Sequence, residues 1–219
     1  MVEIKICGIT RLEDALHAAD CGADALGFIF YRKSPRYIDP EAAEKIIARL
    51  PGRICAVGGF VNEDAEVVKT VAASCGLDLI QLHGNEPPDY CGQFDGDTLI
   101  KALALEMEED LEKAFLYPVR AILVDARDNG RYGGTGKKAS WELAAALGIR
   151  HPLILAGGLN RENITAALQT VRPHAVDINS GVEISPGKKD SGKVKEIIEM
   201  IRREDNRDDH VPIFVSHRQ

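Results

Sequence analysis

The sequence predicts an α/β protein in which eight parallel strands alternate with eight helices and close into a single-domain barrel. Short apolar segments alternate with amphipathic segments eight times, short loops join them, and the composition does not shift along this array. A chain of 219 residues is long enough for one such barrel. Because strands separated by helices pair in parallel, the alternation favours a closed (β/α)8 barrel over the alternative, an open doubly wound sheet.

The expected strands are short and rich in β-branched residues. The first alternates in polarity, whereas the second is almost continuously apolar, which is typical of a strand buried on both faces. The sixth, Arg-Ala-Ile-Leu-Val-Asp, has the same buried character. We expect strands at residues 2–7, 24–30, 53–60, 78–83, 98–103, 120–125, 153–156 and 175–179.

The expected helices carry apolar residues at helical spacing and have clear end signals. Gly22 and Gly76 stop the first and third helices, and Pro40 suits the first turn of the second. Ser140 and Asn160 are the expected N-caps of the sixth and seventh. We expect helices at residues 11–22, 40–50, 63–75, 87–93, 109–116, 140–147, 160–171 and 191–203. Residues 1–203 are therefore expected to form one TIM barrel.

Residues 204–219 fall outside the eight units and form a C-terminal tail. The tail is charged through Asp209 and then ends with an apolar patch at residues 211–215. We expect it to be mobile or to pack on the outside of the barrel, and we assign it no function. An alternative is that the apolar patch is a contact between subunits, since the sequence leaves open whether the protein is a monomer or a homodimer.

The composition excludes several classes of function. A formal net charge of −7 argues against nucleic-acid binding, which needs surplus Lys and Arg. No run approaches the roughly 18 apolar residues of a membrane span, and no secretory signal precedes the first strand. The five cysteines form no C-x-x-C pair, which suits reduced thiols rather than a disulfide or zinc framework. We expect a cytoplasmic protein that contacts neither membrane nor nucleic acid and needs no metal.

Two reactive side chains end strands that are not neighbours in the ring. Functional groups of α/β barrels lie on the loops that follow the strands. Cys7 ends the first strand before a glycine turn, and Asp125 ends the sixth. Facing each other across the mouth, they could remove a proton from one substrate atom and deliver one nearby. The alternatives are that Cys7 is a small core residue and that Asp125 is a helix-capping or salt-bridged carboxylate.

Glycine pairs after the last two strands predict a phosphate site. Gly157 and Gly158 follow the seventh strand, and Ser180 and Gly181 follow the eighth. Glycine lets backbone N–H groups approach an anion closely, and in barrels these two loops commonly bind phosphate. Either pair alone could equally be a turn.

Three further residues of the strand-end loops are candidates for a pocket. Arg36 lies in a loop made rigid by Pro35 and could hold a carboxylate in a two-pronged geometry, although a lone loop arginine is usually a solvated charge. His83 could form a polar wall of the pocket or be a structural histidine. Gly59 is expected to mark a bulge or a close backbone approach.

Several motifs in the same order give this chain a specific resemblance. They are Lys-Ile-Cys-Gly-Ile at 5–9, Ser-Pro-Arg at 34–36, Gln-Leu-His-Gly at 81–84, Asp125 with Gly-Gly-Thr-Gly at 133–136, Ala-Gly-Gly-Leu at 156–159, and Asp-Ile-Asn-Ser-Gly-Val-Glu through Pro-Gly-Lys-Lys-Asp at 177–190. From residue 2 to about residue 203 the chain resembles the phosphoribosylanthranilate isomerase family of tryptophan biosynthesis. The departures are Gly59, where the family often has a bulkier residue, Ala139-Ser140 before Trp141, where it often has Phe-Asp, and the longer tail.

The resemblance implies a reaction and roles for the matched residues. The reaction is the Amadori rearrangement of N-(5-phosphoribosyl)anthranilate into 1-(2-carboxyphenylamino)-1-deoxyribulose 5-phosphate, which needs no cofactor. Asp125 would protonate the furanose ring oxygen, and Cys7, as a thiolate, would remove the proton from C2 of the ribose. Arg36 would hold the anthranilate carboxylate and the glycine loops the phosphate. Asp177 and His83 would be supporting polar groups that bind the substrate.

These roles require shifted pKa values. A free cysteine titrates near pH 8.5 and a free aspartate near 3.9, so at neutral pH each group would mostly be in the wrong state. Burial could raise the pKa of Asp125, while Lys5 or the adjacent helix start could lower that of Cys7, and the sequence leaves open which effect dominates. Two alternative functions remain: the related aminoaldose isomerase of histidine biosynthesis, which resembles an Asp/Asp pair with two phosphate sites, and a non-catalytic barrel that binds a phosphorylated ligand.

Overall fold

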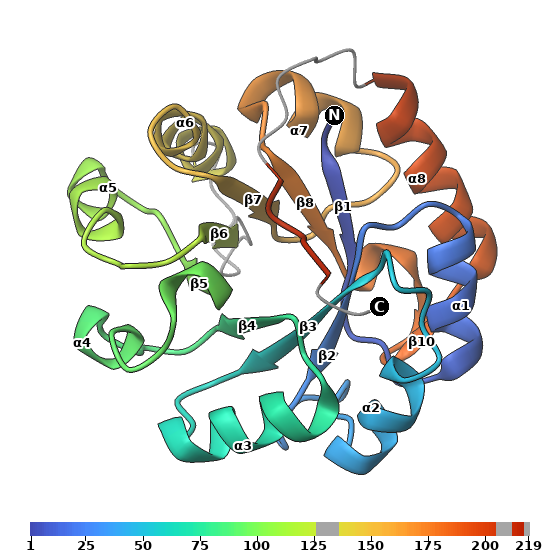
Figure 1. Cartoon of the computed structure of the whole chain (residues 1–219). Helices are drawn as coiled ribbons and strands as arrows, with labels where there is room; N and C mark the ends of the chain where they lie inside the picture. Colours follow the sequence, from blue (N-terminus) through green and yellow to red (C-terminus); the bar gives the residue numbers. More distant parts are fainter. Residues whose placement is uncertain (126–135, 205–211, 217–219) are drawn as a thin grey trace.

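The computed structural model describes residues 1–125, 136–204 and 212–216. Eight parallel strands pair in chain order, and β1 pairs with both β2 and β8, so the sheet closes into a barrel (Figure 1). This confirms the predicted TIM barrel. The strands are β1 (Glu3–Ile6), β2 (Ala25–Ile29), β3 (Cys55–Phe60), β4 (Leu79–Leu82), β5 (Leu99–Leu103), β6 (Ala121–Asp125), β7 (Leu153–Ala156) and β8 (Ala175–Ile178).

Helices follow the strands and surround the barrel (Figure 1). They are α1 (Leu12–Asp20), α2 (Pro40–Ile47), α3 (Ala65–Cys75), α4 (Pro88–Cys91), α5 (Glu108–Ala114), α6 (Gly136–Gly148), α7 (Ile164–Val171) and α8 (Ser191–Glu204), with the short 3₁₀ helices η1 (Gly96–Thr98) and η2 (Ser180–Val182). Within the described ranges, none of the helices combines the length and the apolar character needed to cross a membrane.

Local side-chain chemistry explains several helix ends. The Asp39 side chain accepts the Glu41 N–H at the start of α2, and Asp64 does the same for Glu66 at the start of α3. These bonds satisfy N–H groups that have no partner inside the helix. At the end of α3, Gly76 adopts a left-handed conformation with a φ of 64°, as its stop signal predicts.

The two N-caps expected from the sequence are wrong in position. The helix α6 begins at Gly136, so Ser140 lies inside it rather than at its start. Asn160 accepts the Glu162 N–H in a turn that precedes α7, and the helix itself begins at Ile164. Glycine is a poor helix former, which is why the sequence pattern places the start of α6 too late.

A short antiparallel hairpin follows β8 and η2 and was not predicted. Its strands are β9 (Glu183–Ser185) and β10 (Lys188–Lys189), and Gly187 turns between them with a φ of 79°. Strands of three and two residues with charged side chains show too little alternation to be recognised in a sequence.

In β1 the polar side chains point into the barrel and the apolar side chains point toward the helices. Its apolar residues Ile4 and Ile6 belong to the core between the barrel and the helices. The alternating residues Glu3, Lys5 and Cys7 face the barrel interior, where Lys5 and Cys7 line a cavity and Glu3 bonds to the C-terminal segment. One strand therefore supplies polar groups along the whole height of the barrel.

The C-terminal segment closes the amino-terminal end of the barrel. Ile213 and Phe214 are buried and belong to the same cluster as the inward-facing side chains of the strands. The Glu3 carboxylate accepts both of their backbone N–H groups, and Arg120 donates to the carbonyl of Ile213. The expectation that the tail is mobile or packs on the outside of the barrel is therefore wrong for residues 212–216. A sequence pattern does not show whether the strands and their loops already close the amino-terminal end of the barrel. The sequence therefore could not predict that this segment closes it.

Loss of this segment should destabilise the barrel. We expect Phe214→Ala to lower the free energy of unfolding by about 3–5 kcal/mol, because a buried aromatic ring is lost from the floor, and removal of residues 205–219 to lower it further, because the buried Ile213 is lost as well. Urea unfolding followed by circular dichroism measures this difference. Ile149→Ala is the matched control, because Ile149 is 86% exposed and its truncation should change stability by less than about 0.5 kcal/mol. Equal stability of Phe214→Ala and the unaltered chain would contradict the packing of the segment.

Candidate active site

A cavity lies at the carboxyl ends of the strands. Its volume of about 200 Å³ is more than ten times the about 15 Å³ that one water molecule needs, so it can hold a small molecule. Eight of the nine predicted site residues line it: Cys7, Arg36, His83, Asp125, Gly157, Gly158, Asp177 and Ser180. The strand-end rule therefore brings almost the whole predicted set together.

Cys7 is held at the mouth by backbone geometry. It directly follows β1, and its N–H still donates to the Ile178 carbonyl at 2.9 Å. The next residue, Gly8, turns the chain with a φ of 72°. Gly27 of β2 leaves room for the sulfur, because a Cβ atom there would lie 2.7 Å from Sγ. The thiol position therefore depends on two glycines.

Opposing charges surround the Cys7 thiol. Burial raises the pKa of Cys7, and the negative charge of Asp177 raises it further, while Lys5 and Lys189 act in the opposite direction. Lys5 Nζ lies 2.9 Å from Asp177 Oδ2, and both side chains are buried. Burial alone would lower the pKa of Lys5, but the charges of Asp177 and Cys7 outweigh it and the pKa is raised. The net pKa of Cys7 is raised, because burial and Asp177 outweigh the lowering by the two lysines.

Asp125 and His83 are neighbours on the opposite side of the cavity. His83 Nε2 lies 3.5 Å from Asp125 Oδ2. On the other side of the ring, Nδ1 lies 2.9 Å from Gln81 Nε2. The two ring nitrogens therefore contact the Gln81 amide on one side and the Asp125 carboxyl on the other. His83 is thus a polar wall of the pocket in contact with the predicted acid.

A buried ion pair fixes the backbone on both sides of His83. Lys101 Nζ lies 2.7 Å from Glu86 Oε2 and donates to the carbonyls of Leu82 and Gly84. These two carbonyls flank His83 in the chain. The backbone of the loop after β4 is therefore anchored by Lys101 of β5.

Arg36 lines the cavity but is already bound to a carboxylate. Its Nε and Nη2 atoms donate to Glu183 at distances of 2.6 to 3.1 Å. A Cβ atom at Gly8 would lie 2.9 Å from Arg36 Cδ, so this glycine also makes room for the arginine stem. The alternative of a solvated surface charge is therefore wrong, and the hairpin after β8 supplies a carboxylate partner that was not expected from the sequence.

The two glycine loops differ in what they do. Gly157 and Gly158 both have positive φ, at 93° and 67°, and both line the cavity together with Ser180. The Gly158 carbonyl accepts hydrogen bonds from the side-chain amides of Asn160 and Asn163. Gly181 does not line the cavity, and a Cβ atom there would collide with the Leu159 carbonyl. Gly181 instead allows the two loops to pack closely. A glycine in a sequence motif can serve either loop packing or ligand contact, so the motif alone does not show which.

Gly59 is not a bulge or a point of close approach. The register from β2 through β3 to β4 is regular, and a Cβ atom at Gly59 would meet only ordinary contacts at 3.6 Å or more. The neighbouring Gly58 is the crowded position, because a Cβ atom there would lie 2.3 Å from Leu77 Cδ1. Gly59 instead leaves open space in the cavity wall.

Three polar residues in the cavity lining or directly behind it were not expected from the sequence. Gln81 contacts His83, while Glu183 and Lys189 belong to the unpredicted hairpin. Gln81 carried a signal, because a polar residue inside an otherwise apolar strand must face something polar. Glu183 and Lys189 lie in a charged stretch whose pattern gives no sign that their side chains are buried.

The comparisons with known proteins agree with this geometry. Residues 4–200 match the sequence model of the family described as N-(5'-phosphoribosyl)anthranilate (PRA) isomerase. The chain is 54% identical to the N-(5'-phosphoribosyl)anthranilate isomerase of Syntrophus aciditrophicus over 203 residues, which cover 93% of this chain and 88% of that one. It is 48% identical to that of Pelobacter propionicus, over 92% of this chain and 96% of that protein.

Solved structures give the same result. The chain superimposes on phosphoribosylanthranilate isomerase from Thermotoga maritima with a TM-score of 0.84 at 46% identity, covering 93% of this chain and all of that one. A further structure, at 44% identity and a TM-score of 0.82 over the same shares, is an isomerase in complex with reduced 1-(o-carboxyphenylamino)-1-deoxyribulose 5-phosphate. With a family match over most of its length and a cavity that contains the expected acid, thiol and arginine, this chain belongs to the N-(5'-phosphoribosyl)anthranilate isomerase family.

Proposed function

We propose that Asp125 and Cys7 are the acid and base of the isomerisation that this chain catalyses. The reaction converts N-(5'-phosphoribosyl)anthranilate into 1-(2-carboxyphenylamino)-1-deoxyribulose 5-phosphate in tryptophan biosynthesis. The observation that carries the assignment is that both side chains line one cavity from strands β1 and β6, which are separated by β7 and β8 in the ring. A small substrate between them would have one group on each side.

Ring opening is the first step. The Asp125 carboxyl group gives its proton to the furanose ring oxygen, the bond between that oxygen and C1 breaks, and the nitrogen lone pair forms a Schiff base with C1. A positioned acid of this kind typically contributes about 10² to 10⁴ in rate. His83, 3.5 Å from Asp125, is the polar neighbour that keeps the carboxyl oriented toward the cavity.

Removal of the C2 proton is the second step. The Cys7 thiolate takes this proton, and the electrons of the C–H bond form the enolamine, which then tautomerises to the ketone. The raised pKa of Cys7 makes the thiolate a stronger base for a C–H proton but reduces the fraction of thiolate at neutral pH. Lys5 and Lys189 keep that fraction from falling further. Solvent returns the proton from Cys7 to Asp125 at the end of the cycle.

The remaining lining residues would bind the two anionic ends and the sugar. Arg36 faces the cavity from the loop after β2 and would bind the anthranilate carboxylate, while Gly157, Gly158 and Ser180 would bind the phosphate. Within the described part of the chain, the buried Oδ1 of Asp177 has no hydrogen-bond partner. A buried acceptor needs a donor, and a sugar hydroxyl could supply it. Gly181 would act through the packing of its loop.

The family membership leaves the isomerase of histidine biosynthesis without support, and turnover in the test below would exclude a non-catalytic binding barrel. We propose a cytoplasmic enzyme that acts as a monomer or homodimer. A solved Thermotoga maritima relative is described as monomers generated from a dimeric isomerase. Sedimentation equilibrium would determine which state this chain adopts.

Replacement of either proposed proton-transfer group should slow turnover strongly. We expect Cys7→Ser and Asp125→Ala to lower kcat by about 10² to 10⁴, because each removes one proton transfer. The loss of the substrate's anthranilate fluorescence measures the rate. Cys21→Ser is the matched control, because Cys21 lies on the helix side at α1 and does not line the cavity, so its kcat should be unchanged. An inactive unaltered chain, or nearly full activity in both variants, would contradict the assignment.

The raised pKa of Cys7 should appear in the reactivity of its thiol. Only the thiolate is alkylated, so the rate of alkylation should rise with pH and should continue to rise beyond about pH 8.5, the usual cysteine pKa, because burial raises this one. Asp177→Asn removes a negative charge that raises the Cys7 pKa, so ionisation should move to lower pH. The rate of alkylation of Cys7 by iodoacetamide, followed by mass spectrometry in the free protein, measures this shift. A shift to higher pH in the variant would show that the charge of Asp177 is not what opposes the thiolate.

A further inference from the structure

We propose that Glu183 is a positioning residue that sets the orientation of Arg36, so that one defined edge of the guanidinium meets the substrate carboxylate. This inference rests on the proposed role of Arg36 and extends it to a residue that does not line the cavity. It also gives the hairpin β9–β10 a function, because the hairpin fixes Glu183.

The contact between the two side chains is two-pronged and largely buried. Arg36 Nε donates to both carboxylate oxygens, at 2.9 and 3.1 Å, and Nη2 donates to Oε2 at 2.6 Å. The Glu183 side chain is 5% exposed and that of Arg36 is 19% exposed. Bidentate pairs of this kind fix the plane of the guanidinium as well as its position.

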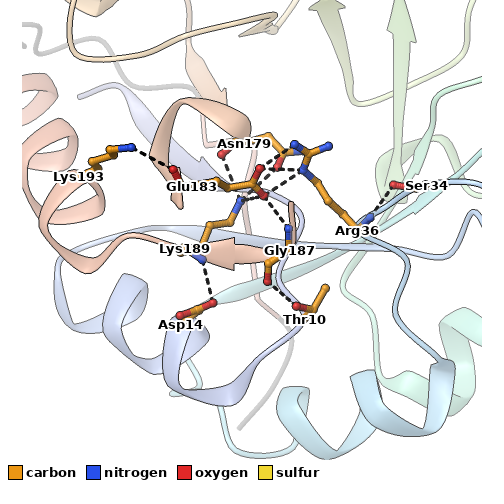
Figure 2. Close-up of polar contacts among 9 residues, drawn as sticks. All are labelled: Thr10, Asp14, Ser34, Arg36, Asn179, Glu183, Gly187, Lys189 and Lys193. Atoms are coloured by element: carbon orange, nitrogen blue, oxygen red, sulfur yellow. Dashed lines mark hydrogen bonds and ion pairs between the residues drawn. The ribbon is translucent and has the colours of Figure 1, made fainter. Parts of the chain in front are cut away.

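The pairing leaves a particular edge of Arg36 for a ligand. A guanidinium has five N–H donors arranged along two edges that can each grip a carboxylate, one formed by Nε and Nη2 and one by Nη1 and Nη2. Glu183 occupies the first edge. Figure 2 shows the third nitrogen, Nη1, pointing away from Glu183. Within the described part of the chain Nη1 has no hydrogen-bond partner, so the second edge remains for the substrate carboxylate.

Glu183 itself is held by the hairpin. Its Oε1 atom also accepts from Lys189 Nζ and from the Gly187 N–H, both at 3.1 Å (Figure 2). Lys193 donates to the Glu183 carbonyl, so the main chain is fixed as well. The carboxylate is therefore held in one orientation, and its hydrogen bonds fix the orientation of the Arg36 guanidinium in turn.

The hairpin is tied to the loops around Cys7. Thr10 Oγ1 donates to the Gly187 carbonyl, and Asp14 accepts the backbone N–H of Lys189 (Figure 2). Lys189 Nζ also donates to Asn179, which packs against Gly8. Arg36, Glu183 and the turn after Cys7 thus form one connected unit, and a ligand carboxylate gripped by Arg36 is placed at a defined distance from the thiol.

Orientation explains this pair better than stability does. A buried ion pair gains little net free energy, because desolvation of both charges opposes their attraction. An arginine with its own partner keeps its side chain ordered before the ligand arrives, so less conformational entropy is lost on binding. The expected measurable effect of Glu183 is therefore on recognition of the ligand carboxylate.

The test compares two ligands in the full chain. The first is 1-(2-carboxyphenylamino)-1-deoxyribulose 5-phosphate, and the second is 1-phenylamino-1-deoxyribulose 5-phosphate, which lacks only the carboxylate. Calorimetry gives the ratio of their Kd values. We expect Glu183→Gln to reduce the preference for the carboxylate at least tenfold, to raise KM by a similar factor, and to change kcat less than KM. Arg36→Lys should do the same, and the double variant should be no worse than Arg36→Lys alone.

The control is another carboxylate paired with an arginine. Asp24 binds Arg202 at 2.7 Å near the start of β2, far from the cavity lining, so Asp24→Asn should affect stability but leave the ligand ratio unchanged. If Glu183→Gln does not fold, Thr10→Val removes the hydroxyl that holds the hairpin and should lower the ratio at least twofold.

Three results would overturn the inference. They are an unchanged ratio in Glu183→Gln, or in Thr10→Val where Glu183→Gln does not fold; a loss in kcat with KM unchanged; and effects of Glu183→Gln and Arg36→Lys that multiply in the double variant. The proposed function fails differently: an inactive unaltered chain removes the enzyme assignment, and an Arg36→Lys variant with an unchanged ratio removes Arg36 from carboxylate binding.

Discussion

The pairing of β1 with β8 is the constraint on which the rest of the molecule depends. Its register places Lys5 opposite Asp177, and the Cys7 N–H donates to the Ile178 carbonyl. The first and the last strand of the barrel therefore meet beside the thiol. Without this closure the Lys5 and Asp177 charges would be buried alone, which is far more costly than burying them as a pair. The same pairing carries the loop after β8, and with it the hairpin, to the loop that holds Arg36.

The charges on this side of the cavity suit an anionic ligand in an acidic protein. Lys5, Lys189 and Arg36 are cations, while Asp177 and Glu183 are carboxylates, and the two kinds are interleaved by direct contacts. Each carboxylate neutralises and orients a cation, and the set retains a positive excess. A chain with a net charge of −7 can therefore present a locally positive pocket, since short distances outweigh distant surface charges that salt screens.

Much of this could be predicted because it depends on local pattern. Alternating apolar and amphipathic segments are enough to predict the barrel, and the rule that function follows strand ends then places Cys7, His83 and Asp125 in one cavity. The unpredicted parts depend on distant partners. Glu183 is far from Arg36 in the chain, so nothing near either residue signals their contact. The inward direction of Lys5 and the cover that Phe214 provides also follow only from barrel closure.

The position of the C-terminal segment has a consequence for how the chain folds. Glu3 and Ile213 are bonded to each other, so contacts that finish the barrel floor join residues near opposite ends of the sequence. Contacts of such long sequence separation form late and slow folding, because the intervening chain must be ordered first. During synthesis the floor stays open until residues 212–216 have left the ribosome, and the nascent barrel exposes its inner apolar side chains until then.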